Sequence, residues 1–503
     1  MTTGSNQPQA NLEIPPTIYR VILCRYQPHR DFPGRRCFSH HILLQSTQRS
    51  TLMLKNSPFA GASVLALITM MASNSPAGDF LQFRGSQGTG VSSAAAIPLE
   101  WSPEKNVAWK VPSPAAGWAQ PLVVGDRLYL TGAVSTADIR PANFANGVKS
   151  PQSMGVSLFS RPPKEPFTWK LFCLSTADGK VLWEQTIAEG QAKFPIHPSN
   201  SWATETPAAD EHGVYVYSGA AGIVAGVDHS GRKLWQRDVG VFKTSNGFGT
   251  GSSVAIHNGL IYVQNLNEQQ SDIWCLDTKT GDVSWQSRRT VAGTSWSTPL
   301  IWQNSRRVEL IISGGDQVDS FDPVTGTQLW TLKNVKAATA CSPCADRDRL
   351  YFGGSDPFSK GPLFAVSAGA SGEIAPAEKN GSFTNCVWLQ ERQGPGMASP
   401  LSTGEFVYTN ENNILKCFNA ATGEKLYQTR LPGLDMLAAS PLLVGDNLLL
   451  LDENGKACIA AVGAEFKQLG SGSLDDVFWA TPAVSGNSLY LRGVESIYCI
   501  RNP

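Results

Sequence analysis

Short apolar stretches separated by polar turns recur along most of the chain. Between residues 118 and 185 four of them follow one another, WAQPLVVGD, RLYLTG, WKLFCLS and KVLWEQ, each short enough for a β-strand. The polar turn before the last stretch holds Gly179, and Trp183 follows four residues later. The same pattern, a turn glycine followed four residues later by an aromatic residue, recurs at Gly231 and Trp235, Gly281 and Trp285, Gly326 and Trp330, and Gly423 and Tyr427. The first four glycines are 52, 50 and 45 residues apart, which predicts a repeat protein built of four-stranded sheets.

The opening strand of this unit can be located eight times. A proline marks most copies, and the positions are Pro121, Pro207, Ser253, Pro299, Pro343, Pro400, Pro441 and Pro482. The last copy ends after its third strand, while NVAWKVP provides a strand with Trp109 in the expected place. Pairing these two segments would close the ring and remove the exposed edges that its two ends would otherwise present. The sequence therefore predicts an all-β, eight-bladed β-propeller of four-stranded antiparallel blades over residues 106–503, closed by an N-terminal strand that completes the last blade.

The first part of the chain lacks this pattern. Residues 1–52 show no periodicity and are interpreted as foreign to the native protein or disordered. Residues 53–77 combine Lys55, an apolar run over 59–71 and a small-x-small site at 75–77, as secretory signal peptides do. A disordered tail followed by a buried helix is the alternative. Residues 78–105 form a lead-in, and we expect the mature protein to begin near Gly78, in the periplasm or outside the cell.

Composition narrows the range of partners. Lys plus Arg and Asp plus Glu both number 41, so the chain has no basic field with which to hold nucleic acid. The apolar run of the signal is shorter than the roughly 20 residues of a membrane-spanning helix, so we expect no membrane-spanning helix after signal removal. We also expect the protein to be a monomer. Cys341 and Cys344 are three residues apart, but the sequence has no second pair with the spacing of zinc ligands. No metal site is therefore predicted. One position of the repeat is occupied by a cysteine in five copies, and we expect small buried thiols there rather than disulfides. These cysteines are Cys173, Cys275, Cys417, Cys458 and Cys499.

The common catalytic signatures are absent from the sequence. It contains no G-x-S-x-G, no H-E-x-x-H, no P-loop and no EF-hand loop. His212, His229 and His257 lie beside turn residues, where solvent-exposed histidines are usual. The glycine-rich NGFGTGSS at 246–253 is not followed by a helical pattern, so we interpret it as the opening strand of the third blade rather than a phosphate-binding loop.

One group of residues stands apart from the structural pattern. Three tryptophans each lie three residues before the proline of an opening strand, which is the innermost strand of a propeller blade. Together with polar residues of nearby loops they are expected at one mouth of the central channel, where an aromatic rim suits a small ligand or peptide. Alternatively, the tryptophans plug the channel and pack against one another. The candidate ligand-binding set is Trp118, His197, Asn200, Trp202, Glu205, Trp296, Met397, Asp475, Asp476 and Trp479, and no catalytic residue is assigned.

The repeated Gly-x-x-x-Trp strand resembles the tryptophan-docking repeat of the PQQ-like β-propeller family, over roughly residues 106–503. In that family the tryptophan of one blade docks against its neighbour, which implies structural roles rather than ligand contacts for these side chains. A large indole buries up to about 250 Å² and its N–H can bond a carbonyl, so it can lock adjacent sheets. The docking residues implied by the resemblance are Trp109, Trp183, Trp235, Trp285 and Trp330.

The resemblance implies two functional branches. One is the quinoprotein dehydrogenases, which hold pyrroloquinoline quinone (PQQ) and calcium; the other includes the scaffold lipoprotein of the outer-membrane β-barrel assembly machine. The sequence lacks the vicinal Cys-Cys of many such dehydrogenases, a C-x-x-C-H haem site, and the lipid-anchor cysteine of the assembly lipoprotein. Its lead-in FLQFRGSQGTGVS is similar to that of secreted family members. We therefore expect a binding or assembly scaffold without a certain cofactor, and the alternative is a PQQ-dependent oxidoreductase with a divergent site at the channel mouth.

Overall fold

A computed structural model describes residues 78–92, 96–141, 160–290, 293–333, 335, 340–355, 360–374 and 386–503. All of them belong to one compact unit, Met71–Pro503. The segments interpreted as a foreign or disordered start, 1–52, and as a signal peptide, 53–77, lie outside the described residues. Within the described ranges the secondary structure is β-strand apart from one short 3₁₀ helix, Ser245–Gly247. The all-β prediction is confirmed for this part of the chain.

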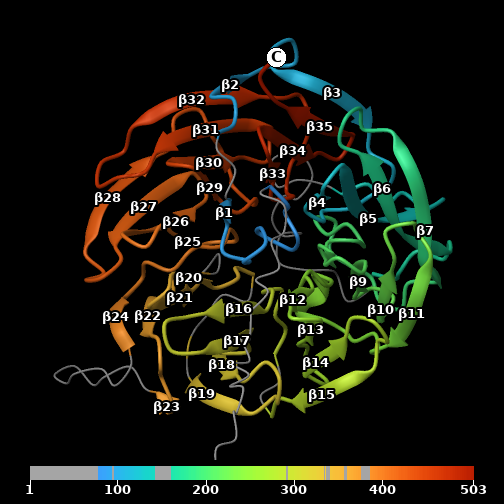
Figure 1. The fold of residues 1–503 in the computed structure, drawn as a ribbon, viewed down its shortest axis with the longest axis horizontal. Helices are drawn as coiled ribbons and strands as arrows, with labels where there is room; N and C mark the ends of the chain where they lie inside the picture. Colours follow the sequence, from blue (N-terminus) through green and yellow to red (C-terminus); the bar gives the residue numbers. More distant parts are fainter. Residues whose placement is uncertain are drawn as a thin grey trace, which may run out of the picture. The chain divides into compact units, whose positions relative to one another are not determined.

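The strands form eight sheets, numbered here in chain order (Figure 1). Sheet 1 holds β4 (Leu122–Val124), β5 (Arg127–Ser135), β6 (Phe167–Ser175) and β7 (Val181–Gly190). Sheet 2 holds β8 (Ala208–Ala209), β9 (Val214–Ser218), β10 (Ile223–Val227) and β11 (Lys233–Asp238). Sheet 3 holds β12 (Ala255–His257), β13 (Leu260–Asn265), β14 (Asp272–Asp277) and β15 (Val283–Arg288). Sheet 4 holds β16 (Leu300–Gln303), β17 (Val308–Gly314), β18 (Gln317–Phe321) and β19 (Gln328–Lys333), with β23 (Gly372–Ile374) added at its edge.

The remaining four sheets follow in the same way. Sheet 5 holds β20 (Cys344–Ala345), β21 (Arg349–Gly353), β22 (Leu363–Ser367) and β24 (Cys386–Gln390). Sheet 6 holds β25 (Leu401–Ser402), β26 (Phe406–Glu411), β27 (Ile414–Asn419) and β28 (Lys425–Arg430). Sheet 7 holds β29 (Leu442–Val444), β30 (Asn447–Leu451), β31 (Lys456–Ala461) and β32 (Gln468–Ser473), with β1 (Val91–Ser92) and β2 (Glu100–Trp101) at its two edges. Sheet 8 holds β33 (Ala483–Ser485), β34 (Ser488–Arg492), β35 (Ser496–Ile500) and β3 (Val107–Pro112).

The repeated glycine and the repeated tryptophan meet between adjacent sheets. Gly179 has a φ of 74°, as its turn requires, and a Cβ at this residue would lie 2.8 Å from the indole of Trp109. The Trp109 Nε1 also donates to the carbonyl of Thr176, at 3.0 Å. The same pair of contacts joins Trp183 to Gly231 and the His229 carbonyl, Trp235 to Gly281 and Thr278, Trp285 to Gly326 and Pro323, and Trp388 to Gly423 and Ala420. Each glycine therefore shapes a turn and leaves room for the preceding sheet's indole.

Trp330 differs from the role that the resemblance implies. Its Nε1 donates to the Glu309 carboxylate of its own sheet, at 2.7 Å, rather than to a carbonyl of sheet 5. β23 pairs in parallel with β19 over this residue, and only 1% of the Trp330 side chain is exposed, whereas Trp183 is half-buried. The added strand and the buried carboxylate thus hold this indole within sheet 4.

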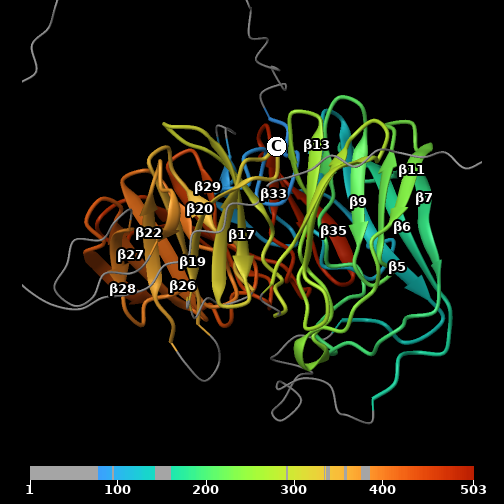
Figure 2. The same cartoon turned by 90° about the horizontal axis from the view of Figure 1, so that it is seen from below.

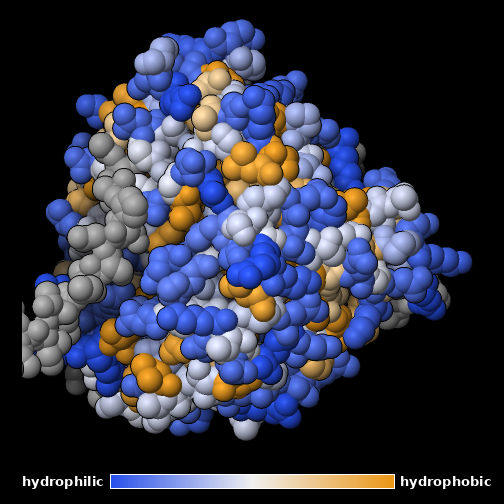
Figure 3. Space-filling model, turned by 45° about the vertical axis from the view of Figure 1, so that its right-hand side comes forward, coloured by the Kyte–Doolittle hydropathy of each residue, from blue (hydrophilic) through white to orange (hydrophobic). Residues whose placement is uncertain are grey.

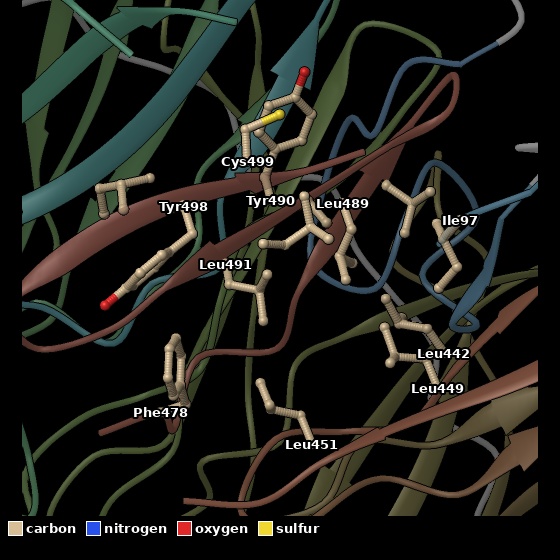
Figure 4. Close-up of a cluster of buried hydrophobic side chains, with 14 of the residues drawn as sticks. Ile97, Leu442, Leu449, Leu451, Phe478, Leu489, Tyr490, Leu491, Tyr498 and Cys499 are labelled. Carbon is tan, nitrogen blue, oxygen red and sulfur yellow. The ribbon is translucent and has the colours of Figure 1, made fainter. Parts of the chain in front are cut away.

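Sheets 1 and 8 contain the two ends of the repeat. β3 pairs antiparallel with β35, with Lys110 opposite Tyr498, and is the outermost strand of sheet 8. Trp109 of β3 reaches the turn of sheet 1, and β33 lies against β4 at the inner side. Leucines of sheets 7 and 8 face one another across their interface, where Leu449 and Leu451 approach Leu489 and Leu491 in one buried cluster (Figure 4).

A series of hydrogen bonds links the starts of the innermost strands. In each case the residue two positions before an opening strand donates its backbone N–H to the side-chain hydroxyl of the same position in the next sheet. The pairs are Gln120 to Thr206, Thr206 to Ser253, Ser253 to Thr298, Thr298 to Ser342, Ser342 to Ser399, Ser399 to Ser440 and Ser440 to Thr481, at 2.8–3.1 Å. We call these residues the hydroxyl series; they connect all eight sheets in chain order.

The start of the lead-in, residues 78–92, runs along the inner ends of the sheets and is called the inner loop here. Phe80 exchanges backbone hydrogen bonds with Val123 of sheet 1, and the Leu81 carbonyl accepts from Ala209 of sheet 2. Further on, Arg84 donates to the carbonyls of Pro343 and Pro400, and β1 pairs in parallel with β29 of sheet 7. Figure 1 shows this blue segment enclosed by the sheets, and Figure 2 shows the sheets from the side.

Candidate functional site

Two of the predicted tryptophans, Trp118 and Trp479, stack on each other beside the loop that contains Ser199 and Ser201. The Trp118 and Trp479 rings lie 5.8 Å apart at 22°. The Trp118 Nε1 donates to the Ser199 carbonyl at 2.7 Å, and its backbone N–H donates to the Ser201 hydroxyl at 2.9 Å. The Trp479 Nε1 donates to the Glu453 carboxylate at 3.1 Å. Both indoles are therefore held by protein groups, as packing between sheets 8, 1 and 2 would require.

The third rim tryptophan is held by the loop before sheet 3. Trp296 donates through Nε1 to the Gly249 carbonyl at 2.6 Å, and Phe248 meets it edge to face at 5.9 Å. Phe248 also lies 4.8 Å from the ring of the buried His197, whose Nδ1 is 2.7 Å from the Ser199 hydroxyl. The sequence NGFGTGSS does not form the predicted opening strand. Gly247 and Gly249 have φ of 68° and 81°, so the chain turns here, and β12 begins only at Ala255.

Asn200 connects two loops, the loop before sheet 2, in which it lies and which we call the Asn200 loop, and the loop before sheet 3. Its Oδ1 accepts from the backbone N–H groups of Ser201 and Trp202 and from the Thr204 hydroxyl, at 2.7–3.2 Å. Its Nδ2 donates to the carbonyls of Phe248 and Thr250, both at 2.9 Å. Every polar atom of the amide is thus bonded within the protein. A calcium ion would have to displace three of these bonds to use the Asn200 oxygen.

Trp202 adopts a backbone conformation that is rare for a bulky residue. Its φ is 62°, in the left-handed region, and its N–H is fixed by the Asn200 oxygen. Its carbonyl accepts from the Trp169 Nε1 at 3.0 Å, and its ring lies 4.8 Å from Phe167. The network around Asn200 therefore offsets local strain and turns the Trp202 side chain against sheet 1.

Glu205 lies beneath this loop rather than at an open rim. Its side chain is 2% exposed, and burial raises the pKa of its carboxyl to about 7. Its Oε1 and the Ser218 hydroxyl have no hydrogen-bond partner among the described residues. Both residues line a cavity of about 10 Å³, close to the space that one water molecule needs. A carboxyl in such a setting is half protonated at neutral pH and faces a space far too small for an organic cofactor.

A larger depression lies between the Asn200 loop and the loop before sheet 3. It has a volume of about 50 Å³, with Trp202 at its side. Phe194, Ile196 and Phe242 give it a half-buried apolar wall, and Lys193 and Lys243 are exposed. We call this depression the lysine groove. Sequence reasoning selected Asn200 and Trp202 of its lining, but it missed the apolar wall and the two lysines because those side chains do not belong to the repeat.

Three predicted residues remain apart from these contacts. Met397 precedes β25 and is half-buried, and Asp475 is exposed. The Asp476 carboxylate accepts from the backbone N–H of Ser496 at 3.0 Å and from the Tyr498 hydroxyl at 3.2 Å, so it holds the β34–β35 turn.

The arrangement does not fit the quinone and calcium site considered from the resemblance. The Asn200 amide is fully bonded, Glu205 is buried beside a water-sized cavity, and Trp118 is covered by Trp479. In the described part of the chain, no cluster of three or more His, Cys, Asp or Glu is placed to hold a metal ion. A planar tricyclic cofactor would need a cavity of several hundred Å³ lined by convergent polar groups.

Comparison with known proteins now places the chain in a family. The profile of the family described as outer membrane protein assembly factor BamB matches residues 100–287, 220–380 and 314–465. The chain belongs to this PQQ-like repeat family. No curated protein matches its sequence.

Solved structures support the β-propeller fold of this PQQ-like chain. BamB from Moraxella catarrhalis is 15% identical with a TM-score of 0.51, over 78% of this chain and 96% of BamB. Quinohemoprotein alcohol dehydrogenase from Comamonas testosteroni is 11% identical with a TM-score of 0.55, over 86% of this chain and 82% of the enzyme. A quinohemoprotein alcohol dehydrogenase from Pseudomonas putida HK5 is 10% identical with a TM-score of 0.53, over 84% of this chain and 80% of the enzyme. At such identities these similarities establish the fold alone.

Several structural residues of this PQQ-like propeller were not anticipated. Trp388 docks between sheets 5 and 6 although it stands late in its repeat. Trp101 of β2 lies against Gly472, in the sheet whose outer strand lacks a tryptophan, and is 3% exposed. His229 was expected in solvent but is half-buried, with its ring nitrogens 2.8 Å from the Tyr129 hydroxyl and the Asp210 carbonyl. Across the described residues no helix has the length and apolar character to cross a membrane.

Proposed function

We propose that the protein is a periplasmic or secreted scaffold that binds another protein, and that it performs no redox chemistry. The family match to an assembly factor supports this role. The observation that carries it is the use of Asn200: the side chain best placed to bind a metal ion instead fixes two loops, and those loops form the lysine groove. The polar groups at this end of the sheets thus serve to shape a surface.

We further propose that the eight sheets are the blades of one closed ring. The hydroxyl series supports this arrangement because it joins each sheet to the next over seven successive steps. Trp109 supports the remaining step, since it belongs to sheet 8 and bonds the Thr176 carbonyl of sheet 1. A closed ring holds the two loops of the lysine groove at a fixed separation, which suits recognition without induced fit.

The partner segment that suits the lysine groove is acidic with an aromatic side chain. Phe194, Ile196 and Phe242 offer an apolar wall, and exposed Lys193 and Lys243 provide positive charge at the rim. Neither lysine has an ion pair among the described residues. Charge complementarity of this kind speeds association and selects against basic partners.

The proposal is tested with protein spanning residues 78–503. PQQ with calcium is titrated while tryptophan fluorescence is followed, and we expect no saturable quenching at micromolar cofactor. Calcium-dependent quenching that disappears in Glu205→Gln, with the fold intact, would replace the scaffold by an oxidoreductase.

A second titration uses a fluorescein-labelled acidic peptide with one central phenylalanine. We expect binding that weakens at least about tenfold in the Lys193→Glu/Lys243→Glu double variant. The matched control reverses two exposed lysines outside the groove, Lys180→Glu and Lys456→Glu. Equal affinity in the two double variants, or equal binding of a peptide with alanine for phenylalanine, would rule out the groove as the docking site.

A further inference from the structure

The outer edges of two sheets are already extended by strands from elsewhere in the chain. In sheet 4, β23 pairs in parallel with Trp330, Thr331 and Leu332 of β19. In sheet 7, β2 pairs in parallel with Ser471 and Gly472 of β32. These positions of the repeat overlap. The register shifts directly after the pair Ser320–Trp330 in sheet 4 and directly after the pair Ile459–Gly470 in sheet 7, so Ser471 and Gly472 correspond to Thr331 and Leu332. The fold therefore has a recurrent place at which an outer strand accepts one more strand.

Both added strands contribute one large apolar side chain, which becomes buried. Ile374 of β23 and Trp101 of β2 are each 3% exposed. In sheet 4 an ion pair also spans the junction, with Lys333 and Glu373 2.7 Å apart. Main-chain pairing, an apolar anchor and a complementary charge are the usual elements of recognition by β-strand addition.

β7 offers the corresponding edge of sheet 1 without an added strand in the described part of the chain. It is ten residues long, while the other outermost strands that no strand covers have five or six. Its Trp183 lies opposite Cys173, which places the docking positions at Trp183–Gln185. Trp183 is only half-buried, unlike the covered Trp330.

β7 also lacks the basic residues and the proline that protect many edge strands. It contains no Lys, Arg or Pro, whereas β3, β11, β15 and β28 each carry a Lys or Arg. β24 lacks them too, but it is half as long. Val181 and Leu182 lie next to the docking positions and are 50% and 52% exposed. Figure 3 turns the side of the molecule that carries β7 forward and shows separate hydrophobic patches among hydrophilic residues there.

We propose that the outer edge of β7 binds an extended segment of a partner protein as an additional parallel strand. The segment carries a large apolar side chain beside Gln185, as Ile374 lies beside Leu332, and a basic residue; the residue that precedes this paired stretch covers Leu182. The basic residue is required because Glu184 and Glu189 are the charged groups of β7, and Glu184 is half exposed although Lys170 contacts it. The proposal rests on the scaffold function and adds a second contact surface, on a different sheet edge from the lysine groove.

The test uses a peptide based on the sequence of the added strand β23. Residues 371–376 read Ser-Gly-Glu-Ile-Ala-Pro, and the probe is this hexapeptide with Lys in place of Glu. Hydrogen exchange of protein 78–503 is measured with and without millimolar probe. We expect slower exchange in Trp183–Gln185, and at least about tenfold weaker binding in Leu182→Lys. The matched control is Leu234→Lys on β11, another exposed leucine that directly precedes a docking tryptophan.

Each result decides the proposal. Protection at β7 that Leu182→Lys removes and Leu234→Lys leaves unchanged supports it, and weaker binding of the unmodified Glu peptide supports the charge requirement. Unprotected β7 amides, or protection that survives in Leu182→Lys, overturn it. Because Leu182 is exposed, unchanged thermal unfolding of the variant verifies that its fold is intact. Failure of the scaffold function is recognised separately, by calcium-dependent PQQ binding.

Discussion

Glu205 shows how one residue links the site to pH. Burial raises the pKa of its carboxyl from 4.5 to about 7, so the native state binds a proton more tightly than the unfolded chain does. A group of this kind contributes stability that is complete below about pH 4.5. That contribution is lost as the pH rises through about 7, because the charged form is penalised only in the folded protein.

We therefore expect Glu205→Gln to behave differently on the two sides of this range. At pH 5 the variant should be only slightly more stable than the parent, because the carboxyl is protonated in the folded protein and pH 5 lies just above its pKa of 4.5 in the unfolded chain. At pH 8 it should be more stable, by up to about 3 kcal/mol, which corresponds to the shift between the two pKa values. Urea unfolding at both pH values measures this difference. A stability gap that is the same at pH 5 and pH 8 would contradict it.

The turn glycines and docking tryptophans that the sequence identified share one property: each repeats. Gly179 and its equivalents have a local pattern, so their turns and their docking tryptophans could be predicted from spacing. Asn200 and Glu205 could be selected as polar residues near the channel mouth, but nothing local to them revealed that the amide is fully bonded and the carboxyl buried. Those properties arise from residues that only folding brings near, such as Phe248, whose carbonyl accepts from the Asn200 amide, and Ser218, which lines the same cavity as Glu205.

At the scale of elements, the added strands mark the limit of sequence reasoning. Strands within a repeat follow from alternation and turn residues. β2 and β23 are two and three residues long, and their partners lie about 370 and 40 residues away. Trp101 packs on Gly472 of β32, a strand without a tryptophan of its own, and only the folded chain reveals this contact.

The inner loop is an element whose stability depends on one charge. Arg84 is fully buried, and desolvation lowers the pKa of its guanidinium to about 10. It donates to the carbonyls of Thr89, Pro343 and Pro400, and no carboxylate pairs with it among the described residues. Hydrogen bonds from a charged donor to these carbonyls offset the cost of burial.

We expect Arg84→Leu to destabilise the protein by on the order of 3 kcal/mol, because three carbonyls lose a buried, charged donor. The midpoint of urea unfolding gives the loss. Arg140→Leu is the control, since the Arg140 side chain is 65% exposed in its contact with Glu495 and its removal should change stability by well under about 1 kcal/mol. If the two variants unfold at the same urea concentration, the inner loop does not depend on Arg84.

At the scale of the whole molecule, the decisive contact is the one between the first and last parts of the repeat. Seven steps of the hydroxyl series join neighbours in sequence, whereas sheet 8 meets sheet 1 through β3, which precedes the repeat. Trp109 at this junction makes the same two contacts as Trp235 does between sheets 2 and 3. In a closed ring the two positions are mechanically equivalent.

This equivalence gives the test of closure. Trp109→Ala and Trp235→Ala should each cost about 3 kcal/mol, because both remove a half-buried indole and leave a cavity above a glycine. Unfolding of both variants, followed in urea by circular dichroism, should stay a single transition. If the ring were open at β3, Trp109→Ala would only loosen an end. It would then cost far less than Trp235→Ala, and the freed edge of β35 would promote association, visible as dimers by size-exclusion chromatography with light scattering. Equal losses without association would mean that the ends of the repeat hold the propeller as firmly as any internal junction does.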